Sequence, residues 1–227
     1  MKSLFCILAL LLYSIENYSQ NTKIKFGVQV GLNYADFRGY QIPKYVSPSY
    51  IESPAVAFLA GFNLEYKIEE KLSVKVELNY ERKSQKADNI VGVIENFDEP
   101  ETIYKFTSTK NYEYLVLPVM IKYCFRNKSS FFVNGGTFIG YLLKSSTEND
   151  LVNVKNNNPV DTTKLNKIID FGLTIGLGKI IEINNKSSIF IEIRENLGLI
   201  NTSKIIVWGN GEVKTNSLNL IIGYSFN

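Results

Sequence analysis

The 227-residue chain contains no histidine and only two cysteines, Cys6 and Cys124. Without histidine, Ser-His-Asp triads, HExxH zinc sites and imidazole proton shuttles are excluded. Two cysteines are too few for a disulfide scaffold or a four-thiolate metal site. The formal net charge is only +3 and the basic residues are spread along the chain, which speaks against a nucleic-acid partner. We therefore predict no catalytic residue, no metal site and no cofactor.

The chain also lacks an apolar segment long enough for a membrane-spanning helix. Residues 4–13 (LFCILALLLY) are apolar, whereas a helical span needs about 20 residues. They follow the basic start Met1-Lys2-Ser3 and precede a polar stretch, a pattern typical of a secretory signal peptide. We predict a signal peptide over residues 1–19 and one domain over residues 20–227. The alternative, a buried N-terminal helix, has no capping residue to support it.

The remaining sequence alternates between apolar and polar residues. In the first such segment, Ile24, Phe26 and Val28 share one face opposite Lys25 and Gly27. This period of two is typical of strands with one apolar and one polar face. It recurs in eight segments, which are residues 24–34, 58–68, 72–81, 112–125, 131–142, 169–178, 189–199 and 218–226.

The connections between these segments alternate in length. Short ones at residues 69–71, 126–130 and 182–187 alternate with long ones at residues 35–56, 82–111, 143–167 and 200–214. This alternation is typical of outer-membrane barrels. The fold class predicted is all-β: an eight-stranded antiparallel up-and-down transmembrane β-barrel with short periplasmic turns and four long extracellular loops. Its predicted location is the cell outer membrane.

Glycine placement indicates which face of the barrel is inside. Glycines such as Gly27, Gly61 and Gly176 lie on the polar face, and the crowded interior of a narrow barrel needs small residues. We therefore place the polar face inside and the apolar face against lipid. A soluble lipocalin-like barrel would need the opposite arrangement. Pro118, within a predicted strand, suggests a β-bulge.

Two sets of residues follow from this orientation. Aromatic belts at the two membrane interfaces are predicted from Tyr34, Phe58, Tyr66, Tyr80, Tyr123, Phe125, Phe131, Tyr141, Phe171, Tyr224 and Phe226. A structural network of paired charges inside the lumen is predicted from Glu65, Lys67, Lys75, Glu77, Lys122, Asp170, Glu192 and Arg194.

Several motifs resemble the outer-membrane β-barrel family of Bacteroidetes that is often labelled PorT-like. They are IKFGVQVGLNYADF (residues 24–37), YEYLVLPVMIKY (112–123), DFGLTIGLG (170–178), IEIRENLGLIN (191–201) and LIIGYSF (220–226). The resemblance implies an outer-membrane location and a barrel fold. A few members of that family are linked to secretion or surface assembly. The last strand ends at Phe226, which resembles the terminal signal read by the barrel-assembly machinery.

The function that we expect is a non-enzymatic barrel whose surface loops serve binding, adhesion, or assembly and secretion support. Expected partners are outer-membrane lipid and lipopolysaccharide, the barrel-assembly machinery during insertion, and a surface or secretion-system protein. One alternative is a soluble periplasmic binding barrel. Another is an outer-membrane enzyme using residues such as Ser108 and Asp98. We interpret the acidic segment of residues 95–101 as a solvated loop, and Asp161-Thr162-Thr163 as a weak match to an O-glycan acceptor motif.

Overall fold

The computed structural model describes residues 23–39, 51–94, 102–125, 131–150, 158–207 and 211–226. The signal peptide expected at residues 1–19 and the acidic segment at residues 95–101 lie outside these ranges and stay predictions. Within the described ranges, no helix is long and apolar enough to cross a membrane.

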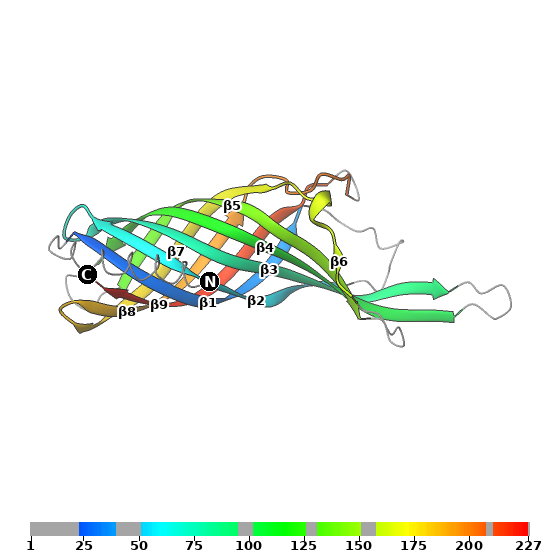
Figure 1. The fold of residues 1–227 in the computed structure, drawn as a ribbon, viewed down its shortest axis with the longest axis horizontal. Helices are drawn as coiled ribbons and strands as arrows, with labels where there is room; N and C mark the ends of the chain where they lie inside the picture. The colour runs from blue at the N-terminus through cyan, green and yellow to red at the C-terminus, as the bar shows by residue number, and fades with distance from the viewer. Residues whose placement is uncertain are drawn as a thin grey trace, which may run out of the picture.

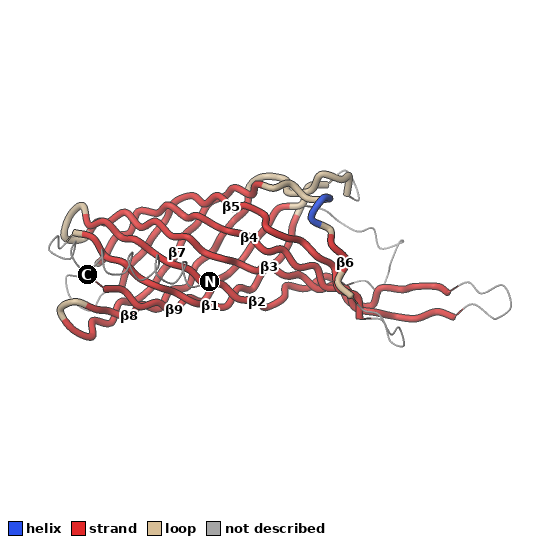
Figure 2. The backbone as a smooth tube through the Cα atoms, viewed as in Figure 1, coloured by secondary structure: helices blue, strands red, loops and turns tan. Residues whose placement is uncertain are grey.

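Eight long strands form a closed antiparallel ring (Figures 1 and 2). Each long strand pairs with the next one along the chain, and pairing of β1 with β9 closes the ring. The fold class predicted from the sequence is thus confirmed. The strands are β1 (Ile24–Arg38), β2 (Ile51–Lys67), β3 (Leu72–Ile94), β4 (Thr102–Cys124), β5 (Phe131–Asp150), β7 (Ile169–Asn184), β8 (Ser187–Gly198) and β9 (Lys214–Phe226).

The two ends of the ring differ. At one end, here named the short-turn end, β2 runs into β3 and β7 into β8 through a few residues. At the other, the long-loop end, the connection from β5 to β7 contains a two-residue strand, β6 (Val160–Asp161), and a 3-10 turn, η1 (Thr163–Leu165). β6 pairs with the end of β5. The connections from β1 to β2, from β5 to β7 and from β8 to β9 are long, as predicted, whereas the one from β3 to β4 is shorter than predicted.

Strands β3 and β4 run much further than expected. Residues 82–111 were predicted to be a loop, but β3 continues to Ile94 and β4 starts at Thr102, and these two residues are paired. The prediction was wrong because it followed the outward apolar residues, which end at Tyr80. Beyond that point the strands are held by backbone pairing and polar contacts. Past the last pairings with β2 (Asp88 with Ile51) and β5 (Thr107 with Asp150), residues 89–94 and 102–106 project from the ring as a two-stranded arm (Figure 1).

The apolar face of the ring points outward. Phe62 and Ile175 are 67% and 66% exposed, whereas the inward-facing Arg194 and Asn219 are each 1% exposed. A soluble lipocalin-like barrel requires an apolar interior and a polar outer wall, so this arrangement overturns that alternative. An outer wall of exposed Val, Leu, Ile and Phe side chains is stable only against an apolar solvent such as lipid.

Glycines inside the ring make room for large inward side chains. A Cβ atom added at Gly223 would collide with the ring of Phe190, and one added at Gly178 would collide with Phe132. The prediction that these glycines face the lumen is confirmed. Because glycine has no side chain, the rings of Phe190 and Phe132 fit into the narrow interior of the ring, which has room for side chains but not for a channel.

Pro118 does not form the bulge predicted for it. It pairs with Phe138 of β5 in an unbroken register, and the β3–β4 ladder keeps the same register at Val119 and Val116 on either side. Only the β3 pairs opposite Pro118 are missing, which fits a residue without an N–H to donate. Register shifts occur instead between Ala55 and Leu59, Ala87 and Ile90, Glu113 and Tyr114, and Glu182 and Asn184.

Candidate functional site

The middle of the lumen holds a network of buried ion pairs centred on Arg194 of β8. Its guanidinium donates two hydrogen bonds to the Glu77 carboxylate across the lumen, at 2.6 and 2.7 Å, and its Nε donates to Glu192 at 2.6 Å. Lys75 Nζ lies 2.7 Å from Glu77 and 3.3 Å from Glu192. None of these side chains is more than 2% exposed. Because two cations are shared between two carboxylates, every charge in this cluster is compensated.

Amide side chains complete the hydrogen bonding of these carboxylates. Gln29 and Asn79 donate to Glu77 at 2.7 and 2.8 Å, and Asn134 donates to Glu192 at 3.0 Å. A buried carboxylate has several acceptor sites, and each unfilled site costs free energy. The sequence analysis missed these amides because it considered only charged residues.

Two further ion pairs flank the centre. Towards the short-turn end, Lys122 Nζ lies 2.7 Å from Glu65. Towards the long-loop end, Lys83 Nζ lies 3.4 Å from Asp170 and 3.2 Å from the Thr215 hydroxyl, which itself donates to Asp170 at 2.6 Å. Charged side chains are therefore stacked in pairs along the lumen.

The structure departs from the predicted network at three charged residues, Lys67, Lys83 and Glu81. The alternation of β2 predicts that Lys67 faces the lumen, but its side chain is exposed at the short-turn end. Lys67 forms no ion pair with another described residue. It is the last residue of β2, where the ring no longer encloses the side chain. Lys83 was missed because the predicted strand stopped at residue 81, although Lys83 continues the same inward alternation.

Glu81 is the one lumen carboxylate of the described residues without an ion-pair partner within 4 Å. It is 1% exposed; Oε1 accepts a long hydrogen bond of 3.4 Å from Asn196, and Oε2 has no partner. Unpartnered atoms of Asn33, Ser217 and Asn219 also lie in the interior. Such groups are ordinarily satisfied by internal water. This part of the lumen is therefore less completely paired than the centre.

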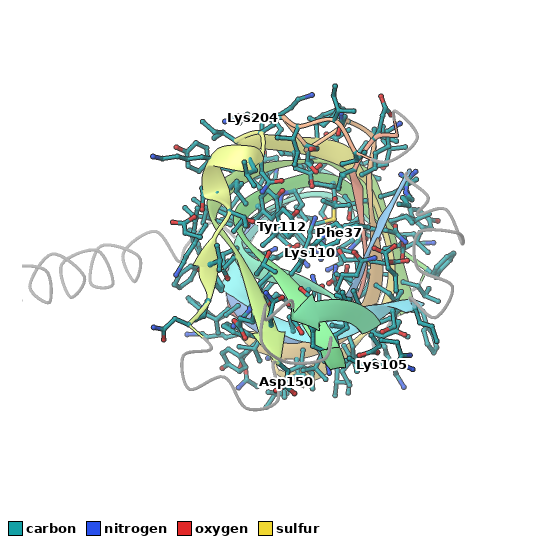
Figure 3. The ribbon with its side chains drawn as sticks, turned by 90° about the vertical axis from the view of Figure 1, so that its right-hand side faces the viewer. Phe37, Lys105, Lys110, Tyr112, Asp150 and Lys204 are labelled. Carbon is teal, nitrogen blue, oxygen red and sulfur yellow. The ribbon has the colours of Figure 1, made fainter. Side chains whose placement is uncertain are left out.

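Apolar side chains close the lumen on both sides of the charged centre. Phe132 and Phe190 lie towards the short-turn end, where Lys75 Nζ sits 4.4 Å from the centre of the Phe190 ring. At the long-loop end, Phe37 and Tyr112 pack with ring centres 4.7 Å apart and point into the mouth of the ring (Figure 3). The other buried members of that cluster are Tyr114, Val116, Phe138, Leu142 and Val213. The described lumen is thus a packed core and not an aqueous channel.

The aromatic residues expected at the membrane interfaces all lie on the outer wall. One group is near the long-loop end and consists of Tyr34, Phe58, Tyr80, Tyr141 and Phe171. The other group is near the short-turn end and consists of Tyr66, Tyr123, Phe125, Phe131, Tyr224 and Phe226. Neighbouring rings touch, as in Phe58 and Tyr80 with centres 5.5 Å apart. We refer to the first group as the outer belt.

The described residues offer little for catalysis. No group of three or more His, Cys, Asp or Glu side chains among them could hold a metal ion. Ser108 is 8% exposed within β4, and Asp98 lies outside the described residues. The Thr163 hydroxyl donates to the Ser145 carbonyl at 3.3 Å, and its backbone N–H donates to Asp161. The glycan motif that contains Thr163 stays a prediction.

Comparison with known families identifies the chain. Residues 18–204 match the family model described as an outer membrane protein beta-barrel domain. The chain belongs to this family. The match extends over most of the ring, and the protein is an outer-membrane β-barrel. The narrower resemblance to PorT-like proteins of Bacteroidetes is not supported by this match and stays a prediction. No curated protein sequence matches the chain.

Solved structures with a similar fold include three outer-membrane proteins. Neisserial surface protein A is 15% identical, with 88% of this chain and 96% of that chain covered and a TM-score of 0.42. OprG from Pseudomonas aeruginosa is 12% identical, with 89% and 96% covered and a TM-score of 0.46. Ail, the attachment invasion locus protein of Yersinia pestis, is 12% identical in its complex with sucrose octasulfate, with 90% and 100% covered and a TM-score of 0.40.

Membership of the family orients the ring. Outer-membrane barrels keep tight turns in the periplasm and long loops outside the cell. The short-turn end is therefore the periplasmic end, and the arm and the η1 turn lie on the outside of the cell.

Proposed function

We propose that this outer-membrane barrel is a non-enzymatic surface-binding protein that contacts its partner through the arm of β3 and β4. The observation that carries the proposal is the projection of these two strands beyond the ring (Figure 1). β1 ends at Arg38 and β9 begins at Lys214, whereas β3 and β4 remain paired as far as Ile94 and Thr102.

Specific contacts hold the base of the arm in place. The Ser84 hydroxyl donates to Asn111 at 2.7 Å, and the Thr107 hydroxyl donates to Asp88 at 2.8 Å. Asn89 has a positive φ of 59° at the register shift within β3. A bulge of this kind increases the local twist of a strand pair. An ordered, twisted ribbon loses little conformational entropy when it binds, which favours recognition.

The closed lumen supports a surface role over transport. The Arg194 and Glu77 side chains are fully buried at the centre, and aromatic clusters pack on both sides of them. An aqueous path would require these ion pairs to separate. Transport of solutes through the ring is therefore the less favoured role.

The partner class divides the proposal into two forms. In the first, the arm binds a molecule outside the producing cell, as an adhesin does. In the second, it binds a surface or secretion-system protein of the same cell, which the PorT-like resemblance favours. We favour the first form, binding of a molecule outside the producing cell, because the arm projects away from the membrane. Insertion of the barrel through recognition of β9 by the assembly machinery is part of the same proposal.

Shortening the arm tests the proposal. Ala87 and Ser108 are paired, so joining them through an Asn-Gly turn should keep the register of the ring. Cells displaying the natural and shortened proteins would be compared for adhesion to immobilised matrix proteins and acidic glycans. The producing strain would be compared for protein secretion. We expect the shortened protein to keep heat-modifiable mobility on SDS gels and to lose adhesion or secretion.

A matched control replaces the periplasmic turn at residues 69–71 with the same Asn-Gly turn. This control should fold and keep the activity that the shortened arm loses. Unchanged adhesion and secretion after shortening would refute the proposal. Stepwise ion conductance of the natural protein in planar bilayers would refute the argument from the closed lumen.

A further inference from the structure

Two connections at the long-loop end are joined into one ordered surface, which we name the bridged platform (residues 162–168 and 201–206). Asn166 and Ser203 form an isolated antiparallel bridge between them. Backbone hydrogen bonds on the two sides of this bridge measure 2.7 and 3.0 Å. The Asn166 side chain also donates to the Ser145 hydroxyl at 3.1 Å. The two segments of the platform are therefore bonded to each other and to β5.

The platform begins directly beyond the outer belt. The Ile168 carbonyl accepts a hydrogen bond from the Leu142 N–H at 2.7 Å, and the Leu199 N–H donates to the Phe171 carbonyl at 2.8 Å. Phe171 belongs to the outer belt, as does Tyr141 beside Leu142. Aromatic belts lie at the level of the lipid headgroups. The bridged platform is therefore at the height where phosphate groups of the outer leaflet occur.

Apolar and basic side chains alternate on the exposed side of the platform. Its exposed apolar residues are Leu165, Ile168, Ile205 and Ile206, and Ile206 is 86% exposed. Its exposed basic residues are Lys164, Lys167 and Lys204. A surface hollow of about 430 Å³ is lined by Lys167, Asn201, Ser203, Lys204, Ile205, Ile206 and Gly211. This combination fits a molecule with an anionic group and apolar chains.

The basic residues of the platform have no carboxylate within ion-pair distance among the described residues. Lys167 and Lys204 form no ion pair with another described residue. Glu212 is bound to Lys214, whose hydrogen bond and charge lower the pKa of the Glu212 carboxyl, and the more weakly acting charge of Lys167 lowers it further. Asp161 accepts hydrogen bonds from the turn that follows it, which lower its pKa as well. Both carboxylates have closer partners, so the two lysines are available to an external anion.

We propose that the bridged platform binds a phosphate-bearing lipid of the outer leaflet. Lys167 and Lys204 contact the phosphate groups, while Ile205 and Ile206 contact the start of the acyl chains. The apolar residues extend the lipid-facing wall, and the basic residues complement an anionic headgroup. This inference depends on the outer-membrane location and not on the arm. The shortened-arm protein would therefore still bind the lipid, and a failure here leaves the proposed function untouched.

Titration of diphosphoryl lipid A into the full-length protein in detergent micelles tests the inference. Trp208, the single tryptophan, follows Val207 in the chain and supplies a fluorescence signal. The midpoint temperature of the gel-mobility shift supplies a second one. A lysine near an anionic membrane surface contributes on the order of 1 kcal/mol. We therefore expect lipid A to bind the double variant Lys167→Gln, Lys204→Gln about 30-fold more weakly.

The control carries the same change in charge on β3 and β4, Lys86→Gln with Lys105→Gln. Lys105 lies at the opposite edge of the long-loop end from Lys204 (Figure 3), so the control should bind lipid A like the natural protein. Equal weakening by both double variants would overturn the inference in favour of general surface charge. Displacement of lipid A by millimolar inorganic phosphate would overturn it in favour of a small-anion site. Unchanged affinity of the Lys167, Lys204 variant would also overturn it.

Discussion

Arg194 is the residue whose removal should affect the barrel most. It compensates two buried carboxylates at once, with contacts of 2.6 to 2.7 Å to Glu77 and Glu192. In an Arg194→Met variant, these two carboxylates share a single cation, Lys75. Breaking a buried ion pair by removing one partner costs about 3–5 kcal/mol. We expect a loss of this size in the free energy of unfolding.

An exposed ion pair of the same kind supplies the reference. Arg82 lies 3.4 Å from Glu148, and their side chains are 33% and 45% exposed. Exposed pairs contribute about 0–1 kcal/mol, so Arg82→Met should scarcely change stability. Urea titration of the proteins in lipid vesicles, followed by the mobility of unheated samples on SDS gels, measures the two losses side by side.

A double variant separates charge compensation from packing. Changing Glu77→Gln together with Arg194→Met leaves Lys75 facing Glu192 alone, at 3.3 Å. We expect this double variant to be no less stable than Arg194→Met, because the cluster is again neutral. The reasoning is refuted if Arg194→Met loses no more stability than Arg82→Met, or if the double variant loses the sum of both single changes.

Three further changes test the interior and the outer wall. Gly223→Val should lower the free energy of unfolding by about 1–3 kcal/mol, because the new side chain collides with the Phe190 ring. Ile222→Arg places a charge in the middle of the lipid-facing wall, between Val30 of β1 and Ile191 of β8, and should cost about 2–4 kcal/mol in the same urea titration. Glu81→Gln should leave the unfolding midpoint unchanged or raise it, because it removes a buried carboxylate that has no ion-pair partner.

Each of these changes has a matched comparison. Gly135→Ala should be neutral, since the nearest atom to its new Cβ is 3.8 Å away. Ile222→Leu keeps the wall apolar and should also be neutral. Glu77→Gln removes a fully paired carboxylate and should destabilise, in contrast to Glu81→Gln. A Gly223→Val protein as stable as Gly135→Ala, a tolerated Ile222→Arg, or a Glu81→Gln loss above about 1 kcal/mol would contradict the respective argument.

The ring could be predicted from local pattern because lipid imposes a strict rule on one face. The lipid-facing residues of a membrane strand are almost all apolar, as Val28, Val30 and Leu32 are in β1, so these strands can be recognised from the sequence. Glu195 of β8, the cross-strand partner of Ile175, is an outward-facing exception. The arm could not be predicted in this way. From Glu81 to Asn89 the sequence of β3 is ERKSQKADN, and no alternation of apolar residues marks the strand.

The residues of the candidate sites could likewise be predicted only in part. Inward alternation placed Glu77, Glu192 and Arg194 in the lumen, but it could not tell which charges would meet. Glu77 and Arg194 are far apart in the chain and lie on opposite parts of the ring. The platform lysines carried no signal at all, because Lys167 and Lys204 belong to separate connections.

The sequence by itself therefore determined the class of fold, the direction of each face and the membrane in which the protein resides. These properties follow from side-chain alternation and connection length, which are local. Only the tertiary structure decided that Arg194 compensates Glu77, that β3 and β4 extend into an arm, and that Asn166 meets Ser203 in the bridged platform. Those contacts depend on closing the ring in one register, which brings together residues that no local pattern relates.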